Sequence, residues 1–284
     1  MALWNSVNFV NSVLKRTIHN LFLRSLSALC FSALSLIPLS APAQDMRKIE
    51  RDIVHCVNRI TNWWEVEEKE YEPEALDSLE EYNQMLSDKL IYYCTKYPAT
   101  ISYHFKSFDG DTSNLTILTS ADTMLRIYNW DSRLGGTMVF FRSVIEYKSG
   151  NTTKAYSKPD ATEEGDPDYY YQRVSMLKAN GKTYYIATYE GKYSNPGVYA
   201  GVKLFTIEDG KMNDTVHLIK TTTGLHNGIE YEYNQFAADI DYSKYNVHYD
   251  ENTNTIYIPI VIGEKMTKRF IKYKFTGKYF EKEL

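Results

Sequence analysis

The sequence predicts an α+β protein in which an N-terminal helical hairpin packs on a large antiparallel β domain. Apolar residues recur at helical three- and four-residue steps as far as about residue 98 and alternate every second residue from about residue 100. The later part is also rich in Tyr, Ile, Val and Thr, which favour strands. We therefore divide the chain into a leader over residues 1–43, a helical hairpin over 44–98 and an antiparallel β domain over 99–284.

The leader has the pattern of a cleavable signal peptide. Residues 1–43 contain no Asp or Glu, and basic residues precede an apolar run over 26–39 that is followed by Ala-Pro-Ala at 41–43. The run is shorter than the roughly 20 residues of a membrane-spanning helix and is interrupted by Pro38. We expect a mature chain from about Gln44, exported to the periplasm, the cell surface or the medium, with no membrane span.

The charge balance of the mature chain argues against nucleic acid as a partner. Cleavage removes Lys15, Arg16 and Arg24 and no acidic residue, so the 32 basic residues fall to 29 against 36 acidic ones, a net charge of about −7. Nucleic-acid binders usually carry a basic patch or stripe instead. We expect a soluble domain that does not bind nucleic acid.

Two amphipathic helices are predicted in the hairpin. The first carries an apolar stripe that includes Ile53 and Ile60, and Pro73 suits the first position of the second helix, which ends before Pro98. In an antiparallel hairpin that turns near residues 70–73, Cys56 lies opposite about residue 87.

The hairpin register also bears on the two mature cysteines. Position 87 is about 10 Å along the axis from Cys94, and a disulfide needs Cα atoms within about 7 Å. A bridge between Cys56 and Cys94 stays open, but the register favours two free buried thiols.

The β domain contains a loose internal repeat. A turn followed by two strands recurs from Asp122, Lys182 and Asn254, whose positions are 60 and 72 residues apart. Hairpin sequences such as Ala179-Asn-Gly181 separate the strands. A curved meander sheet or a sandwich explains this pattern with the fewest assumptions. A β-propeller, which needs at least about four blades, is the alternative.

No familiar catalytic or metal-binding motif occurs in the sequence. It lacks the nucleophile elbow, the paired-histidine zinc motif and the phosphate loop. No histidine of the mature chain lies within four residues of another His or Cys except His55, beside Cys56, and adjacent helical side chains point apart. We therefore predict no metal and no cofactor, and expect a binding protein more than an enzyme.

Pairs of carboxylates leave a hydrolase open as an alternative function. Glu230 and Glu232 share a strand face near His226, and Asp239 and Asp241 alternate in the same way. Such pairs serve glycosidases when they lie about 5–10 Å apart, although exposed strands commonly alternate charges too. The acidic loop 160–168 has oxygen ligands for Ca²⁺ but lacks the spacing of an EF-hand.

Tyrosine is the unusual feature, with 25 residues and none before residue 71. A tyrosine ring either packs across strands or stacks on a sugar or a protein partner. In the run Tyr169, Tyr170 and Tyr171, alternation points the middle ring away from the other two. We choose these three, together with Trp130 and His226, as candidate binding residues.

The layout of a signal peptide, a short helical segment and a Tyr-rich β domain resembles uncharacterised exported proteins of Gram-negative bacteria. This resemblance covers the full length and implies no activity. The leading hypothesis is a non-catalytic binding module for a saccharide or an envelope protein. The alternatives are an exported carboxylate-dependent hydrolase using residues such as Glu230 or Asp241, and a periplasmic inhibitor or immunity-type protein whose acidic surface faces a basic partner.

Overall fold

The computed structural model describes residues 40–70, 73–110, 114–158, 168–237 and 240–283. Residues 48–284 form one compact unit, and the stretch up to Arg47 forms another, of which the structure describes the first turns of a helix. Most of the predicted signal peptide lies outside the described residues, as does most of the acidic loop 160–168, so both remain predictions.

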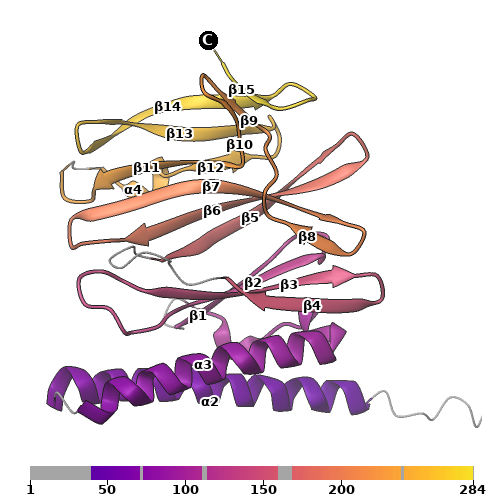
Figure 1. Ribbon diagram of the computed structural model, residues 1–284, viewed down its shortest axis with the longest axis vertical. Coiled ribbons are helices and arrows are strands. Elements are labelled where there is room, and N and C mark those ends of the chain that lie inside the picture. Colours follow the sequence, from indigo (N-terminus) through magenta and orange to yellow (C-terminus); the bar gives the residue numbers. More distant parts are fainter. Residues whose placement is uncertain (1–39, 71–72, 111–113, 159–167, 238–239, 284) are drawn as a thin grey trace, which may run out of the picture. The chain divides into compact units, whose positions relative to one another are not determined.

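Two long helices form the predicted hairpin (Figure 1). Helix α2 spans Ser40–Glu70 and α3 spans Pro73–Lys96. Their apolar stripes are buried, with Ile53 and Ile60 on α2 and Leu86 on α3 at 1% exposure or less. None of the helices in the described part of the chain combines the length and apolar character needed to cross a membrane.

The helix register explains the state of the cysteines, both of which are free and buried. Asp52 of α2 accepts a hydrogen bond from the Tyr93 hydroxyl, and its Oδ1 lies 3.2 Å from Lys89 Nζ. Cys56, one turn further along α2, therefore faces α3 about one turn before Lys89. The prediction of two free thiols is confirmed.

Beyond the helices, the chain forms short 3₁₀ helices η2 (Pro98–Ser102) and η3 (Lys106–Phe108) and then three separate sheets. Sheet A contains β1 (Leu115–Thr119), β2 (Leu125–Asp131), β3 (Phe141–Ser149) and β4 (Thr152–Ser157) in that order. Sheet B has the order β11-β7-β6-β5, with β5 (Tyr169–Ala179), β6 (Lys182–Lys192), β7 (Gly197–Glu208) and β11 (Gly228–Asn234); β8 (Lys211–Asn213) pairs with β7.

Sheet C has the order β10-β9-β15-β14-β13-β12. It contains β9 (Ile219–Thr221), β10 (Gly224–His226), β12 (His248–Asp250), β13 (Thr255–Ile262), β14 (Lys265–Phe275) and β15 (Phe280–Lys282). The one-turn helix α4 (Tyr242–Tyr245) precedes β12. The three sheets are not closed into a barrel, and the α+β prediction is confirmed.

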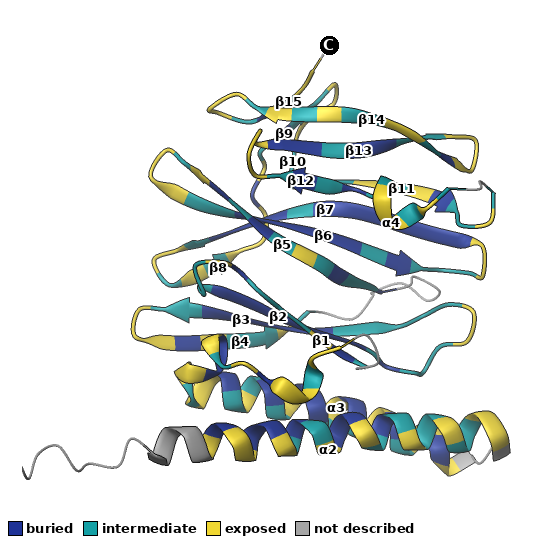
Figure 2. Ribbon diagram, turned by 180° about the vertical axis from the view of Figure 1, so that it is seen from behind, coloured by how far each residue is buried: buried dark blue, intermediate teal, exposed yellow. Residues whose placement is uncertain are grey.

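Each unit of the predicted repeat forms the inner hairpin of a different sheet. The strand pairs β2–β3, β6–β7 and β13–β14 correspond to the repeats that begin at Asp122, Lys182 and Asn254. Sheets A and B share one buried core and sheets B and C share another, so three meanders are stacked face to face (Figure 2). The sequence predicted a curved meander or a sandwich, and the structure has three stacked meander sheets.

One strand pair departs from the expected all-antiparallel pattern. Strand β15 pairs with β9 in parallel, through Phe280 with Ile219 and Glu281 with Lys220. The chain reaches β9 directly from sheet B, whereas β15 returns from β14 through a hairpin, so the two strands meet running in the same direction. Sequence alternation reports which face a residue occupies but not the direction of its neighbour.

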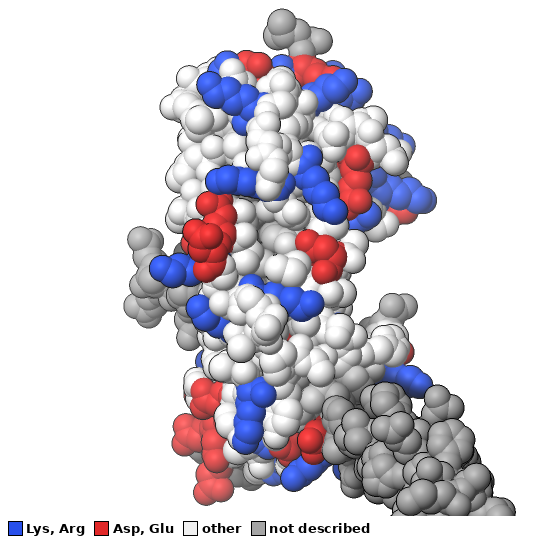
Figure 3. All heavy atoms as spheres, turned by 90° about the vertical axis from the view of Figure 1, so that its right-hand side faces the viewer, with Lys and Arg blue, Asp and Glu red and all other residues white. Residues whose placement is uncertain are grey.

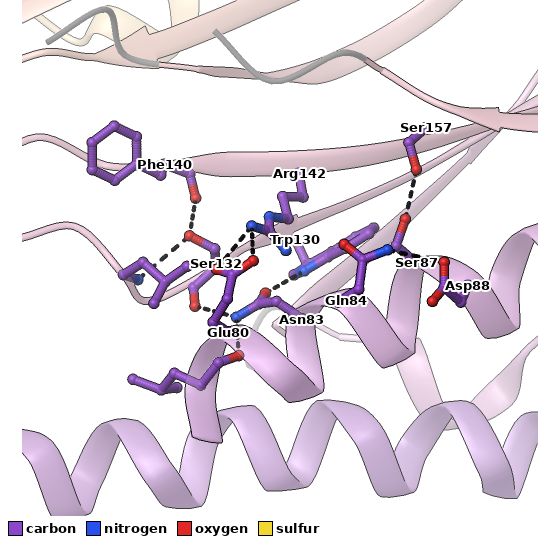
Figure 4. A network of polar contacts seen from close by, with 12 residues as sticks. Glu80, Asn83, Gln84, Ser87, Asp88, Trp130, Ser132, Phe140, Arg142 and Ser157 are labelled. Atoms are coloured by element: carbon purple, nitrogen blue, oxygen red, sulfur yellow. Dashed lines mark hydrogen bonds and ion pairs between the residues drawn. The ribbon is translucent and has the colours of Figure 1, made fainter. Parts of the chain in front are cut away.

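Sheet A is buried on both faces, and its contact with α3 is polar (Figure 4). The buried Asn83 donates to the carbonyls of Leu79 at 2.7 Å and Ser132 at 2.8 Å, and its Oδ1 accepts from Trp130 Nε1 at 2.8 Å. At the rim, Arg142 contacts the Glu80 carboxylate at 2.7 Å. Because every polar group of this amide and indole is satisfied, Trp130 is held at one position on the helix.

A second buried polar cluster joins sheet A to the 3₁₀ segment. The fully buried Glu146 accepts from Thr100 Oγ1 at 2.6 Å and from the Tyr128 hydroxyl at 2.8 Å, while Arg126 donates to the Thr100 carbonyl at 2.5 Å. Burial raises the pKa of the Glu146 carboxyl, and these hydrogen bonds and Arg126 oppose that shift. These hydrogen bonds attach η2, which follows α3 in the chain, to sheet A.

Tyrosine rings fill the space between sheets A and B, and two of them lie across glycines of the neighbouring strand. Tyr199 pairs with Gly191, and Tyr189 pairs with Gly201. A Cβ on Gly191 would lie 2.2 Å from the Tyr199 ring, so only glycine admits the ring there. The ring centroids of Tyr169, Tyr171, Tyr189 and Tyr199 lie 4.3–6.5 Å apart, mostly edge to face. Cross-strand packing therefore accounts for these four tyrosines.

We predict that Gly201→Ala destabilises the fold by about 1–3 kcal/mol. The added Cβ would lie 2.6 Å from the Ile229 carbonyl oxygen and 2.6 Å from the Tyr189 hydroxyl. Gly136→Ala is the matched control, because nothing lies within 4 Å of its Cβ. Chemical denaturation of the two variants measures the difference. Equal unfolding free energies for both would contradict the packing described here.

Candidate functional site

A polar pocket lies where strands of sheets B and C end. We call it the strand-end pocket; its volume is about 320 Å³. It is lined by Tyr193, Ser194, Pro196, Gly197, Glu232, Tyr233, Asn234, Gly263 and Glu264. Three segments supply these residues: the β6–β7 connection, the end of β11 and the β13–β14 turn.

The end of β11 ties the other two segments together. Asn234 donates its backbone N–H to the Glu264 carbonyl at 2.9 Å and its side-chain amide to Glu264 Oε2 at 3.2 Å. Gln235 donates its backbone N–H to the Pro196 carbonyl at 2.8 Å and its amide to the Asn195 carbonyl. The pocket is therefore held by backbone contacts as well as by side chains.

The two turns have sequences that suit their shapes. Gly263 adopts φ +63° in the two-residue turn between Ile262 and Lys265, a conformation that glycine adopts readily. In the β6–β7 connection, Gly197 lies under the Tyr193 ring, and a Cβ there would lie 2.3 Å from it. The ring of Tyr193 is thus held at the mouth of the pocket.

The back wall is formed by Tyr233. Its ring stacks on Tyr242 with centroids 5.2 Å apart, and its hydroxyl donates to Glu190 Oε2 at 3.4 Å. Glu190 also accepts from Asn246 Nδ2 at 2.8 Å and from Gln172 Nε2 at 3.1 Å. Glu190 lies behind the wall and positions Tyr233; it is not among the lining residues.

The pocket is negative. Glu232 and Glu264 are both exposed, and the nine lining residues include no Lys, Arg or His. Within the described residues neither carboxylate forms an ion pair. Burial raises the pKa of the Tyr193 hydroxyl, and the charges of Glu232 and Glu264 raise it further. Both carboxylates thus act on the same ring.

Two large, exposed apolar side chains are close in sequence to residues that line the pocket. Phe236, two residues beyond Asn234, is 74% exposed, and Ile262, next to Gly263, is 58% exposed. They are the most exposed large hydrophobic side chains of the described chain. The opposite strand ends carry Lys and Arg interspersed with Asp and Glu (Figure 3).

The structure does not bring the five sequence-predicted binding residues together. Trp130 is 2% exposed against α3, and Tyr171 is 1% exposed between sheets A and B. Tyr169 is half-buried with Lys158 Nζ 3.8 Å from its ring centroid, and Tyr170 points to the other face, against Phe141. His226 lies in β10 of sheet C, within 2.9 Å of Thr223 Oγ1.

Of the predicted carboxylates, Asp239 lies outside the described residues, and the described ones are apart from the pocket except for Glu232. Glu230 accepts from the Tyr189 hydroxyl at 2.8 Å, and Asp241 caps α4, where Lys244 and Ser243 lower the pKa of its carboxyl. Only Glu232 lines the pocket. No group of three His, Cys, Asp or Glu side chains in the described part of the chain is arranged to hold a metal ion.

Sequence reasoning missed most of the pocket. The alternation of Glu230 and Glu232 was a usable signal, as was the presence of an apolar Phe236 in a polar turn. Nothing in the sequence indicated that residues 193–197 and 263–264 meet. No protein-family model, curated protein or solved structure matches this chain.

We predict that Glu190 makes the unfolding free energy fall as pH rises above about 4.5, the ordinary pKa of a Glu carboxyl. Burial raises the pKa of Glu190 in the fold, so the folded state binds its proton more tightly than the unfolded chain does. The contribution is fully present below 4.5 and is lost as pH rises through the raised pKa.

Glu190→Gln tests this, because glutamine keeps an acceptor oxygen and cannot ionise. Denaturation of both proteins over a pH series should show the wild type losing stability relative to the variant as pH rises. A difference between the two that does not change with pH would contradict the prediction.

Proposed function

We propose that this chain is an exported, non-catalytic binding module that recognises a protein partner through the strand-end pocket and the exposed Phe236 and Ile262. The observation that carries the proposal is the exposure of Phe236 and Ile262, which follow and precede, in the sequence, segments that line the pocket. Single exposed apolar residues are ordinary. Here the two most exposed ones lie on turns that one backbone hydrogen bond, Asn234 N–H to the Glu264 carbonyl, holds together.

This arrangement resembles the energetic centre of a protein interface. A few anchor side chains usually supply most of the binding energy, and the surrounding contacts exclude water from them. Phe236 and Ile262 would be covered by the partner, which would keep water away from the polar groups between them. The inhibitor or immunity-type alternative is one case of this proposal, since an acidic pocket complements a basic partner.

A saccharide is the second candidate ligand. The half-buried Tyr193 ring and the acceptors of Glu232 and Glu264 are groups that can contact a sugar ring and its hydroxyls. A volume of about 320 Å³ lies at the small end of the roughly 300–1,000 Å³ of ligand pockets. The exposed Phe236 and Ile262 have no evident use for a ligand of that size, so the protein partner is favoured.

Hydrolysis has less support. It would need two converging carboxyls with unlike environments. The carboxyl near the pocket whose pKa burial raises is Glu190, which lies behind Tyr233 and is held by three donors.

Export is proposed from the leader pattern of residues 1–43. The intact mass of the protein purified from its native cells tests it. A chain beginning near Gln44 supports export, and a chain that retains Met1 contradicts it.

Photo-crosslinking in the native cells tests the binding site. A crosslinking amino acid at position 236 or 262 should capture one and the same protein, and one at position 225 should not. Leu225 is the matched control because it is 48% exposed and lies in β10, at the far edge of sheet C from β12.

The double variant Phe236→Ala, Ile262→Ala should weaken binding of that captured protein about tenfold or more, as truncation of interface anchors does. Leu225→Ala should leave it unchanged. Calorimetry against cell-wall glycans tests the saccharide candidate in parallel. Glycan binding without a crosslinked protein would replace the proposal by the second candidate, and absence of both would contradict it.

A further inference from the structure

We infer that Glu146 is a proton switch: protonated, it helps to hold η2 on sheet A, and ionised, it draws Arg126 away from η2. The inference goes beyond the proposed binding site and does not depend on it. Glu146 lies in β3 of sheet A, whereas the strand-end pocket is formed by sheets B and C. The side chain is fully buried, so any charge that it carries must be balanced inside the protein.

The hydrogen bonds around Thr100 indicate that Glu146 carries a proton. Thr100 Oγ1 lies 2.7 Å from the Tyr97 carbonyl oxygen and 2.6 Å from Glu146 Oε1. A hydroxyl has one hydrogen to donate, and a carbonyl oxygen only accepts. Both contacts are hydrogen bonds at the same time only if Thr100 donates to Tyr97 and a protonated Glu146 donates to Thr100. The other carboxyl oxygen accepts from the Tyr128 hydroxyl at 2.8 Å, so both oxygens of the protonated group are satisfied.

The position of the Arg126 guanidinium is consistent with a neutral Glu146. The two residues are directly opposite each other on β2 and β3, where Cβ atoms are normally about 4.5–5.5 Å apart. None of the ion pairs among the described residues includes either of them. Arg126 Nη1 instead donates to the carbonyls of Thr100 at 2.5 Å and Tyr103 at 2.8 Å. Arg126 therefore holds η2 and leaves the carboxyl beside it unpaired.

Among the titratable groups that face one another here, Glu146 is the one whose charge changes. Burial is the largest effect on the Glu146 carboxyl and raises its pKa, and hydrogen bonds and the charge of Arg126 oppose that shift without reversing it. The other groups that face it are Tyr128 of β2 and Cys94 of α3. Burial raises the pKa of both well above their ordinary values, so both stay neutral. From η2 the contact is Thr100, which does not titrate.

Loss of the Glu146 proton changes the hydrogen bonds of its neighbours. One hydrogen leaves the network, so Thr100 can donate to Tyr97 or to Glu146 but not to both. The new negative charge lies beside Arg126, and hydrogen bonds between two charged groups are the stronger kind. Each N–H that turns to the carboxylate leaves the carbonyl of Thr100 or Tyr103. The attachment of η2 to sheet A is thus firmest while Glu146 is protonated.

The segment over residues 98–108 transmits this change to the helical hairpin. Glu50 of α2 accepts from the Tyr103 hydroxyl at 2.8 Å and from the Ser107 backbone N–H at 2.7 Å. The segment is therefore held by α2 on one side and by Arg126 of sheet A on the other. When Arg126 releases it, α2 loses this link to the sheet. A proton on Glu146 thereby controls how firmly the hairpin is held.

Hydrogen exchange of the purified protein over a pH series tests the switch. Protection of the amides of residues 98–108, corrected for the intrinsic pH dependence of exchange, should be constant below about pH 4.5. It should fall about tenfold or more as pH rises through the raised pKa of Glu146, because hydrogen bonds from a charged donor are lost. Glu146→Gln should keep the protection constant, because glutamine can donate to Thr100 and accept from Tyr128 but cannot ionise. No fall in the wild type, or an equal fall in the variant, would overturn the inference.

Glu190→Gln is the matched control, because Glu190 is a second buried carboxyl with a raised pKa and lies in sheet B. Its segment 98–108 should lose protection with pH as the wild type does. Constant protection in this variant too would assign the effect to global stability and overturn the inference.

A measurement on the wild type alone keeps the inference testable if Glu146→Gln does not fold. Carbon-13 NMR follows the Glu146 carboxyl, and proton NMR follows the Arg126 Nε–H. Both signals should shift at one pH, above about 4.5. Titration of Glu146 at or below 4.5, or titration without a change at Arg126, would contradict the exchange of partners.

Discussion

The packing of tyrosine rings against glycines between sheets A and B is the interaction on which the rest of the fold depends. Sheet B is the middle layer, so its two faces must satisfy two neighbours at once. Toward sheet C it presents aliphatic side chains such as Val202 and Leu204. Toward sheet A it presents Tyr189 and Tyr199, which are wide enough to need the space that Gly201 and Gly191 leave. A tyrosine-rich composition is thereby explained mainly by packing.

The strand-end pocket follows from the same stacking. Hairpins that run in parallel layers end near one another, so the turns of sheets B and C meet at one end of their strands. Asn234 and Gln235 join these turns through the backbone, which frees the side chains of Tyr193, Glu232 and Glu264 to face the hollow. Because backbone contacts define the pocket, its lining can serve recognition without weakening the fold. The protein partner is proposed because these lining side chains are available for recognition.

Much of the fold was predictable because it follows from the local spacing of apolar residues along the chain. The repeat predicted from Asn254 forms the β13–β14 hairpin, and the helix register correctly indicated free thiols at Cys56 and Cys94. The repeat was visible because each layer uses the same hairpin. The alternation of apolar and polar residues along a strand does not show which faces of its sheet are covered by other parts of the protein. Both faces of sheet A are buried, so Trp130 and Tyr171, chosen for binding, lie in the two cores on either side of it.

The parallel pairing of β15 with β9 and the strand-end pocket were not predictable for a related reason. Each depends on where segments about 30 to 70 residues apart meet, and no motif in these segments indicates which other segment they contact. Tyr193 is one of 25 tyrosines, and nothing in the sequence around it or around Gly263 and Glu264 indicates that they meet. The β6–β7 connection and the β13–β14 turn lie close together because sheets B and C are adjacent layers.

Tyrosine nitration in the native protein, mapped by peptide mass spectrometry, tests most directly whether packing explains the tyrosines. The account predicts rapid modification of Tyr92, which is 51% exposed, and protection of Tyr171 and Tyr185, which are 1% and 2% exposed, until the protein is unfolded. Modification of Tyr171 or Tyr185 in the folded protein at the rate of Tyr92 would contradict it.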